Sequence, residues 1–326
     1  MKPSYFKASK RNINNSYSRR EFIKTSAITL GAISIVSLPL ACNNRRERLF
    51  KYAFCNEILE DTSWPEQCEI IGRAGYDGVE IAPFTLAQGG VLEIGPAARR
   101  QMVRDMENAG IECAGLHWLL APPPTGLHFT TPDNQQRQKT VDYLVALIDF
   151  CGDLGGPVMI FGSPRQRSTV EGISVEDARN NFADGLAQVA DHAAQRNVKI
   201  LVEALSKDQT DVVNTLEDAV EIVNKVNHPA IRSMFDFHNT ADETEPLHEL
   251  VRNYYPYIEH VHVQNMDGTL ITTDAIPENY IPAFEVLKEL EFDKWVSLEV
   301  FDYTPGGVFI AEEGMRTFLE IERKIT

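Results

Sequence analysis

The sequence predicts an α/β fold of the (β/α)8 barrel type, in which eight parallel strands close into a barrel surrounded by helices. Short apolar or β-branched runs alternate with segments of helical periodicity, and no two runs are joined by a hairpin-type turn. About 277 residues follow the N-terminal segment without a Ser/Gly-rich linker or a low-complexity stretch, close to the size of roughly 250 residues typical of such barrels. We therefore expect a single domain over residues 50–326.

Eight runs are candidates for the strands, and they cover residues 51–57, 78–83, 111–120, 158–162, 200–205, 232–237, 258–264 and 296–301. Between them, residues 138–151 and 215–226 place apolar side chains at spacings of three and four, as amphipathic helices do. Asn214 or Thr215 is a candidate cap for the second of these helices. An open, doubly wound sheet is the less favoured alternative, because no G-x-G-x-x-G follows the first run.

The first 42 residues carry the features of an export signal. The run SRREFIK from Ser18 follows the twin-arginine pattern S-R-R-x-F-[LI]-K, and residues 25–41 are mildly apolar and uncharged. The run PLAC resembles a lipobox, so Cys42 either carries a lipid that anchors the protein to a membrane or lies near an ordinary cleavage site. We expect a twin-arginine-type signal peptide over 1–42, a tether over 43–49, and a location in the periplasm or, as a lipoprotein, at a membrane.

The charge balance excludes one class of partner. The chain has 31 Lys and Arg against 47 Asp and Glu, a formal net charge of −16. Residues 1–42 hold seven of the basic and one of the acidic residues, so the remaining chain has a net charge of −22. Nucleic acid is a poor partner for such a surface, because phosphate binding needs clustered cations. A neutral or cationic small molecule is the better candidate.

The cysteines beyond Cys42 show no metal-binding spacing. Cys55, Cys68, Cys113 and Cys151 lie in apolar surroundings without a C-x-x-C pair. Buried free thiols are the favoured interpretation, and a disulfide formed in an oxidising compartment is the alternative.

Four acidic or imidazole side chains occur at the ends of the last four apolar runs. They are Glu203, Asp236, His262 and Glu299, which lie 33, 26 and 37 residues apart, about one strand–helix unit each. In a (β/α)8 barrel the carboxyl ends of the strands point into one mouth, so these side chains would meet there. Three carboxylates and an imidazole suit one divalent metal ion, with Mn²⁺ favoured and Mg²⁺, Co²⁺ or Zn²⁺ as alternatives. Four unrelated polar strand ends are the other interpretation.

The segments around these residues resemble those of the xylose-isomerase-like TIM-barrel superfamily of sugar isomerases and epimerases, and most of all the ketose 3-epimerases of the D-tagatose and D-psicose type. In that group the fifth strand reads roughly V-E-P-L-N-R-x-E-T-x-x-x-N-T, and the segment here is VEALSKDQTDVVNT from Val202. The D-x-x-H motif of the sixth strand appears, one residue shorter, as Asp236-Phe237-His238. The H-x-H of the seventh strand is His260-Val261-His262, and Glu299 matches the glutamate of the eighth.

The resemblance implies a metal-dependent reaction beside a sugar ketone. A divalent ion held by the four residues would stabilise an enediolate, and Glu203 and Glu299, the family's acid–base pair, would remove and return a proton. A sugar isomerase or epimerase is the lead interpretation. An eliminase or hydrolase of 3-keto-glycosides would use the same site, and a non-catalytic sugar-binding lipoprotein is a third alternative. A trinuclear-zinc endonuclease is disfavoured, because residues 82–84 (APF) supply no metal ligand.

The departures from the family pattern concern the substrate. Lys207 stands where the family has an arginine, Gln209 where it has a second glutamate, and Gly268 where an arginine follows the seventh strand. Lysine cannot reproduce the bidentate hydrogen bonds of arginine, and glutamine adds a donor to an acceptor-only position. We expect Lys207 and Gln209 to bind a sugar or keto-glycoside other than a simple ketohexose. The sequence leaves open whether the sugar is phosphorylated and whether the chain forms a homo-oligomer.

Two further strand ends contain candidate substrate-binding residues. His117 and Trp118 lie near the end of the third run and would hydrogen-bond and stack on a sugar, with core packing as the alternative. His238 is a candidate substrate ligand. His260 shares a strand face with His262 and is a candidate supporting partner.

Other polar residues at strand ends carry weaker signals. Glu57 would line the mouth or be an ordinary polar strand end, and Glu80 reads as a buried partner for a backbone group. Arg165 and Arg167 follow the fourth run, where a solvated loop is the favoured interpretation.

Overall fold

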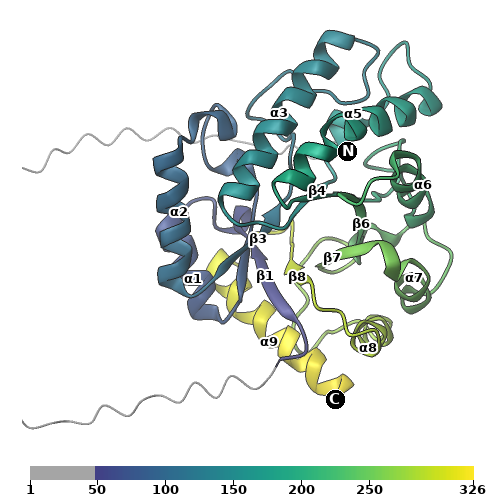
Figure 1. Cartoon of the computed structure of the whole chain (residues 1–326). Helices are drawn as coiled ribbons and strands as arrows, with labels where there is room; N and C mark the ends of the chain where they lie inside the picture. The colour runs from purple at the N-terminus through teal and green to yellow at the C-terminus, as the bar shows by residue number, and fades with distance from the viewer. Residues whose placement is uncertain (1–47) are drawn as a thin grey trace, which may run out of the picture. The chain divides into compact units, whose positions relative to one another are not determined.

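The computed structural model describes residues 48–326, which form a closed barrel of eight parallel strands in chain order (Figure 1). Because β8 pairs with β1, the barrel has no free edge. The strands are β1 (Lys51–Cys55), β2 (Gly78–Ile81), β3 (Glu112–Leu116), β4 (Val158–Phe161), β5 (Lys199–Val202), β6 (Ile231–Asp236), β7 (Ile258–Val263) and β8 (Trp295–Leu298). The predicted (β/α)8 fold is confirmed. Every strand ends one to four residues before the expected run does, because the runs included residues of the barrel mouth.

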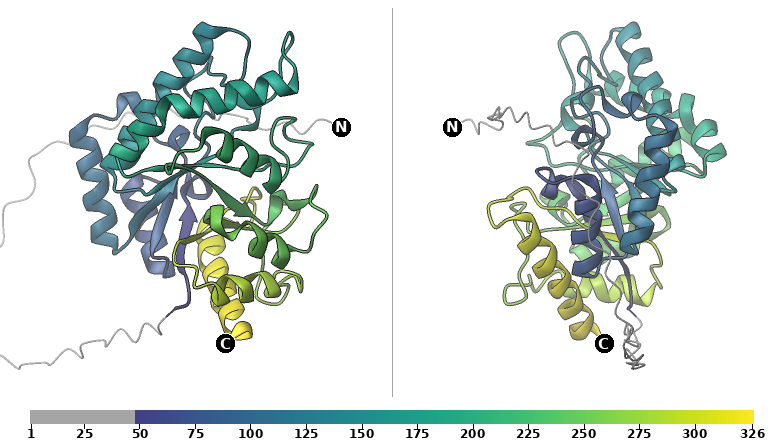
Figure 2. Two further views of the ribbon diagram at one scale, coloured as in Figure 1. Left: turned by 45° about the vertical axis from the view of Figure 1, so that its right-hand side comes forward. Right: turned by 90° about the vertical axis from the view of Figure 1, so that its left-hand side faces the viewer.

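Helices cover the outside of the barrel (Figures 1 and 2). They are α1 (Trp64–Ala74), α2 (Pro96–Ala109), α3 (Asn134–Asp153), α4 (Pro164–Arg167), α5 (Val175–Gln195), α6 (Leu216–Val226), α7 (Leu247–Tyr254), α8 (Ile281–Glu289) and α9 (Gly307–Ile325). Thr215 caps α6 as expected, and the Asp218 carboxylate accepts a hydrogen bond from the Thr215 backbone in return, which forms a capping box. The last helix, α9, packs against both α1 and α8 and completes the ring of helices.

The core has an apolar outer layer and a mixed interior. The outer layer lies between the strands and the helices and contains most of the buried apolar side chains. Inside the barrel the apolar side chains form two small clusters: Val158, Ile160, Leu201 and Met234, and Ala53, Ala114 and Trp295. Trp295 begins β8, so its ring fills the amino-terminal end of the barrel. Four cysteines are buried free thiols, as expected: Cys55, Cys68, Cys113 and Cys151.

A bulge in β3 determines where His117 points. β2 and β3 change register at Gly115, which leaves Ala114 as an extra residue in β3. Side chains alternate between the faces of a strand, so the bulge brings both Ala114 and His117 to the interior, whereas Leu116 joins the outer layer. A Cβ on Gly115 would lie 2.6 Å from the carbonyl oxygen of Val158, which explains the glycine at this position.

The N-terminal predictions fall largely outside the described residues. The expected signal peptide over residues 1–42, with Cys42, lies outside them, and so does the tether up to residue 47. The last two residues of the expected tether contact the domain. The Arg48 guanidinium lies 3.1 Å from Asp77, and the Leu49 N–H donates to Glu322 at 2.9 Å.

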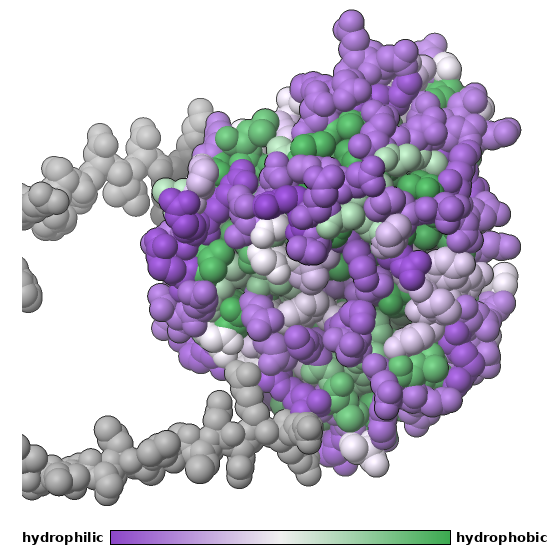
Figure 3. All heavy atoms as spheres, viewed as in Figure 1, coloured by the Kyte–Doolittle hydropathy of each residue, from purple (hydrophilic) through white to green (hydrophobic). Residues whose placement is uncertain are grey.

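The surface of the described part is predominantly polar. Figure 3 shows hydrophilic residues over most of one face, with apolar residues in small separate groups. This agrees with the acidic composition of the chain. Within residues 48–326, none of the helices combines the length and the apolar character that a membrane span requires.

Candidate metal centre

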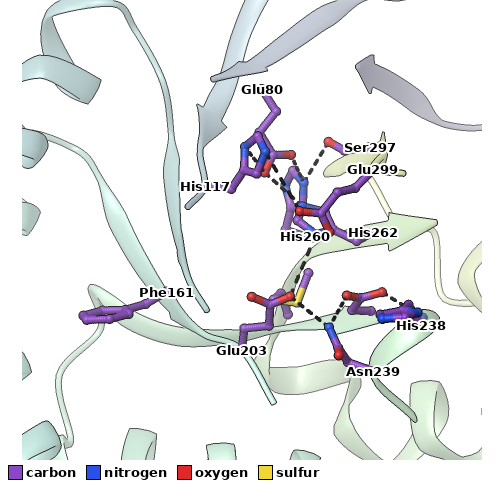
Figure 4. Close-up of polar contacts among 12 residues, drawn as sticks. Glu80, His117, Phe161, Glu203, His238, Asn239, His260, His262, Ser297 and Glu299 are labelled. Atoms are coloured by element: carbon purple, nitrogen blue, oxygen red, sulfur yellow. Dashed lines mark hydrogen bonds and ion pairs between the residues drawn. The ribbon is translucent and has the colours of Figure 1, made fainter. Parts of the chain in front are cut away.

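Four ionisable side chains converge at the carboxyl ends of β5 to β8 (Figure 4). Glu203 follows the last residue of β5, Asp236 ends β6, His262 lies within β7, and Glu299 follows the last residue of β8. One ligand atom from each residue lies within 4.8 Å of the other three, and all four side chains are buried. The structure thus brings together the four residues that the sequence spacing placed at successive strand ends.

The three carboxylates of this group repel one another. Burial, together with the charges of Asp236 and Glu299, raises the pKa of Glu203 well above its usual value. Burial and the charge of Glu299 also raise the pKa of Asp236. Burial opposes the ionisation of Glu299 as well, but the charge of His262 outweighs it and lowers the pKa of Glu299. In the metal-free protein the site therefore retains protons that a bound cation would displace.

The donor atoms fit a divalent cation. Nδ1 of His262 is buried without a hydrogen-bond partner, 3.0 Å from Glu299 Oε2 and 4.0 Å from Glu203 Oε1. Gly162 leaves room for the Glu203 carboxylate, because a Cβ there would lie 2.2 Å from Oε2. Carboxylate oxygens with one imidazole nitrogen are ligands that suit Mn²⁺ and related ions. Glu203, Asp236, His262 and Glu299 could therefore hold one divalent metal ion.

The opposite side of the mouth carries a second ionisable pair. His117 follows β3, and its Nε2 lies 2.9 Å from Oε2 of Glu57, which belongs to the 3₁₀ helix η1 (Asn56–Leu59). The same Nε2 lies 3.9 Å from Glu299 Oε1. Burial disfavours the charged imidazole, but Glu57 and Glu80 outweigh it and raise the pKa of His117 to about 9. A protonated imidazole therefore faces the candidate metal ligands across the mouth.

A buried carboxylate, Glu80 of β2, lies beneath both groups (Figure 4). Its Oε1 is 2.9 Å from Nε2 of His262 and 3.3 Å from Nδ1 of His117, and its Oε2 is 2.7 Å from Nε2 of His260. The His260 nitrogen also hydrogen-bonds the Ser297 hydroxyl at 2.9 Å. Burial opposes a charge on Glu80, yet the three imidazoles hold its pKa well below the usual range. Glu80 therefore accepts from imidazoles, whereas the sequence suggested a partner for a backbone group.

These side chains open into a pocket with an empty volume of about 330 Å³, part of which is open solvent. It is lined by His117, Trp118, Gly162, Ser163, Pro164, Glu203, Leu205, Gln209, Asn239, Glu299 and Phe301. The rings of Trp118 and Phe301 form an apolar wall, with centroids 6.2 Å apart. Among the described residues that line the pocket there is no Lys or Arg, the side chains that usually recognise anions.

Three of the five residues expected to bind the substrate line this pocket, and they are His117, Trp118 and Gln209. Lys207 lies outside the pocket. Its side chain is 69% exposed, and Nζ is 3.6 Å from Asp242 on the surface. Gln209 is directed inward, where its amide donates to Asn239 Oδ1 at 2.7 Å.

Asn239 occupies the position that the D-x-x-H spacing gives to the family's histidine. His238, which we expected to bind the substrate, is absent from the pocket lining, and its ring packs against Phe301 with centroids 5.2 Å apart. The Asn239 amide donates to Asp236 Oδ2 at 2.5 Å and lies 3.4 Å from Glu203 Oε1. The sequence analysis did not identify Asn239, although a count of three residues from Asp236 reaches it.

The expectation of a solvated loop after β4 is wrong for Arg167, whose side chain is 0% exposed. Its Nη1 donates to the carbonyl oxygens of Phe161 at 3.0 Å and Glu203 at 2.7 Å, and its Nη2 to that of Val213 at 3.4 Å. Burial lowers the pKa of Arg167 to about 10, so the guanidinium remains a cation at neutral pH. Arg167 therefore ties the carboxyl ends of β4 and β5 together behind Glu203.

The chain is similar in sequence to sugar epimerases and to dehydratases. A probable ketose 3-epimerase from Synechocystis sp. is 23% identical over 236 residues, which are 71% of this chain and 76% of that protein. A 3-dehydroshikimate dehydratase from Pseudomonas putida is 26% identical over 215 residues, which are 65% of this chain and 30% of that protein. Similarity to both groups shows that related barrels carry out more than one reaction.

Solved structures and a family profile give the same assignment of the fold. D-psicose 3-epimerase from Clostridium cellulolyticum, solved with D-tagatose, superposes with a TM-score of 0.73 at 15% identity, over 84% of this chain and 99% of that one. The 3-keto-D-glucoside 4-epimerase of E. coli superposes with a TM-score of 0.68 at 15% identity, over 82% and 99%. Residues 68–321 match the profile described as xylose isomerase-like TIM barrel. The chain therefore belongs to the xylose isomerase-like TIM barrel family, as the resemblance of its strand-end motifs predicts.

Proposed function

We propose that the chain is a divalent-metal-dependent sugar isomerase or epimerase that moves a proton on the carbon beside a ketone, through an enediolate. The observation that carries this proposal is the convergence of Glu203, Asp236, His262 and Glu299 within 4.8 Å. Glu203 and Glu299 also line the pocket, so a bound sugar would contact them. We expect Mn²⁺ as the ion, and the ketose 3-epimerases among the relatives agree with this reaction class.

The proton transfer is assigned to the two glutamates. Glu203 follows β5 and Glu299 follows β8, so a sugar carbon in the pocket would have a carboxyl group on each side. One carboxylate removes the proton from one face of the carbon, and the other glutamate returns a proton to the opposite face, which inverts that centre. Asp236 and His262 would complete the ligand set, and Nδ1 of His262 lies 3.0 Å from Glu299 Oε2. A bound divalent ion would supply the Lewis acid that polarises the ketone.

The pocket favours a neutral sugar or keto-glycoside as the substrate. A phosphate or carboxylate group would find no Lys or Arg among the described residues of the lining. The amides of Gln209 and Asn239 offer hydrogen bonds to hydroxyl groups, and the wall of Trp118 and Phe301 suits an apolar sugar face. Gly268 accepts a hydrogen bond from the Phe301 N–H at 2.8 Å and brings no cation to this side.

A second candidate reaction, elimination from a 3-keto-glycoside, is favoured by His117. It begins with the same proton abstraction, at C2, after which the bond between C1 and the glycosidic oxygen breaks. The leaving oxygen must then take up a proton. The His117 imidazolium lines the pocket and is oriented by Glu57 at 2.9 Å, so it could donate that proton. The products would be an unsaturated keto sugar and the free alcohol.

Deuterium exchange tests the proposed reaction. The Mn²⁺-loaded protein is incubated in D₂O with free ketoses and with 3-keto-glycosides, and the reaction is stopped with a chelator before NMR. We expect deuterium on the carbon beside the ketone, and its loss in Glu203→Gln or without metal. The product separates epimerisation from elimination. Tight binding of metal and sugar without any exchange would contradict the proposal and favour the alternative of a non-catalytic sugar-binding lipoprotein.

We also propose export by the twin-arginine route, into the periplasm or to a membrane-anchored form. The support is the SRREFIK run from Ser18 and the lipobox-like run that ends at Cys42. Replacement of both Arg19 and Arg20 by lysine should retain the precursor in the cytoplasm, as cell fractionation would show. Cys42→Ala should release the exported protein from the membrane fraction only if Cys42 carries a lipid.

A further inference from the structure

Glu80 contacts both sides of the mouth, and the proposed reaction gives it no role. β2 pairs only with β1 and β3, yet the Glu80 carboxylate reaches across the barrel to His262 on β7. The side chain is 0% exposed. Its interaction partners are three imidazoles, those of His117, His260 and His262. The Glu80 backbone pairs with β1 and β3, whereas its side chain faces the ring of His262, a candidate metal ligand.

We propose that Glu80 is a positioning residue that fixes which ring nitrogen of His262 faces the metal, and that the same carboxylate orients His117 in the opposite half of the mouth. The inference rests on the proposed metal centre. It goes beyond that centre because Glu80 touches neither the proposed ion nor the sugar pocket.

The two ring nitrogens of His262 have different surroundings. Nε2 hydrogen-bonds Glu80 Oε1 at 2.9 Å, so this nitrogen bears a proton whether the ring is charged or neutral, and a neutral ring leaves Nδ1 free to bind a metal. Nδ1 has no hydrogen-bond partner and lies 3.0 Å from Glu299 and 4.0 Å from Glu203. Without an acceptor at Glu80, the proton could sit on either nitrogen and the ring could rotate. Glu80 therefore keeps Nδ1 directed at the ligand set.

The second step concerns the shared oxygen. Oε1 of Glu80 lies 2.9 Å from His262 and 3.3 Å from Nδ1 of His117, whose Nε2 is held by Glu57 at 2.9 Å. Both imidazoles are thus aligned on one fully buried atom. The other oxygen, Oε2, contacts His260 at 2.7 Å, and His260 is anchored in turn to Ser297. Because both oxygens have imidazole contacts, rotation of the carboxylate would lengthen at least one of them.

Glu80→Gln is the appropriate test, because it preserves shape and burial but replaces one acceptor oxygen with an amide donor. We expect the affinity for Mn²⁺, measured by competition with a chelator, to fall about 10- to 100-fold. Glu57→Gln is the matched control. It makes the same Glu-to-Gln change in a residue that contacts His117 but forms no hydrogen bond or ion pair with His262. The affinity of this variant for Mn²⁺ should therefore stay within about threefold of the wild type.

A second readout, by NMR, needs no catalytic activity, and its first part needs no metal. In wild-type protein labelled with ¹⁵N-histidine, the Nε2 proton of His262 should appear as a downfield, slowly exchanging signal, and Glu80→Gln should shift or abolish it. Addition of Zn²⁺ should shift the Nδ1 resonance of His262 in the wild type. A wild-type protein that lacks the protected Nε2 proton would overturn the proposal even if Glu80→Gln fails to fold.

The outcomes separate this inference from the proposed function. If wild-type protein binds no Mn²⁺ or Zn²⁺, the proposed function fails, and the Nε2 proton still decides the role of Glu80. If wild-type protein binds metal and Glu80→Gln binds it equally well, with the same His262 signals, Glu80 is not a positioning residue although the metal centre stands. If Glu57→Gln weakens Mn²⁺ as much as Glu80→Gln does, the effect is general to this buried network and the specific assignment is wrong.

Discussion

The two halves of the barrel mouth differ in how their charges are balanced. β5 to β8 contribute Glu203, Asp236, His262 and Glu299, a set with three carboxylates and one imidazole. β1 to β4 contribute the pair of Glu57 and His117, in which each charge has its partner at 2.9 Å, together with the Trp118 ring. The ligand set of β5 to β8 has an excess of negative charge, and the Glu57–His117 pair is balanced. The Glu80 carboxylate of β2 contacts imidazoles of both halves.

The difference indicates which half depends on a ligand from outside. In the half formed by β5 to β8, burial and then repulsion between carboxylates raise the pKa values of Glu203 and Asp236, a cost that a bound cation would offset. In the other half, Glu57 and His117 compensate each other without any ion. We therefore expect metal affinity to reside in β5 to β8, and the residues of β1 to β4 to act on the substrate without affecting the metal.

The largest expected effects come from one substitution in each half. Asp236→Asn should weaken Mn²⁺ binding at least about 100-fold, since the loss of an outer partner alone costs 10- to 100-fold. His117→Gln should leave Mn²⁺ affinity within about threefold but reduce the turnover of an elimination substrate about 10²- to 10⁴-fold, the range of a positioned acid. Titration calorimetry and the deuterium assay measure the two quantities. Similar losses of metal affinity in both variants would contradict the assignment of metal binding to β5 to β8 alone.

The next effect concerns Arg167, which joins the halves at β4 and β5. Arg167→Met should destabilise the metal-free protein by about 2–4 kcal/mol, because three buried carbonyl oxygens lose the guanidinium donor and that of Glu203 has no other donor among the described residues. Urea unfolding gives this difference, and Arg167→Lys should lose less because it keeps the charge. Arg165→Met, on the exposed side of α4, is the control and should change stability by no more than about 0.5 kcal/mol. If the three variants and the wild type unfold at the same urea concentration, the hydrogen bonds of Arg167 do not stabilise the protein.

A smaller effect follows from competition between protons and metal in β5 to β8. Because the pKa values of Glu203 and Asp236 are raised, the folded metal-free protein binds protons more tightly than the unfolded chain above the ordinary carboxyl pKa. Its unfolding temperature should therefore fall as the pH rises from about 5 to 7. The Mn²⁺ affinity should rise over the same interval, by about tenfold per pH unit for each displaced proton. Glu299 has a lowered pKa and acts only at lower pH. A pH-independent affinity would contradict the prediction.

The two halves also differ in how far the sequence predicts them. Each candidate ligand of β5 to β8 ends an apolar run, and the runs repeat at one strand–helix unit, so periodicity and strand-end geometry suffice to place them together. The same reasoning places His117 at the mouth but not its direction, because the bulge at Gly115 decides which face that side chain takes. A single extra residue in a strand reverses the alternation on which such predictions rest.

Contacts between distant strands and contacts to the backbone were the parts that the sequence did not predict. Glu80 meets His262 across the barrel, 182 residues away along the chain, and nothing local to either residue indicates this contact. Arg167 looks like a loop arginine because its acceptors are carbonyl oxygens, which leave no mark in the sequence. Asn239 was overlooked because the expected residue type was histidine, and His238 lay one position away.

The smallest effects separate Gln209 from Lys207, two neighbours that the sequence assigned to the same role. Gln209 donates to Asn239, which donates to Asp236, so Gln209→Ala should raise the KM several-fold and weaken Mn²⁺ slightly as this chain of hydrogen bonds loosens. Lys207 lies outside the pocket, 69% exposed beside Asp242, and a surface ion pair contributes little. Lys207→Ala should therefore leave KM and kcat within about twofold. A large rise in KM for Lys207→Ala would mean that the loop closes over the sugar and carries Lys207 into the pocket, and β5 to β8 would then bring a cation to the substrate as well as amides.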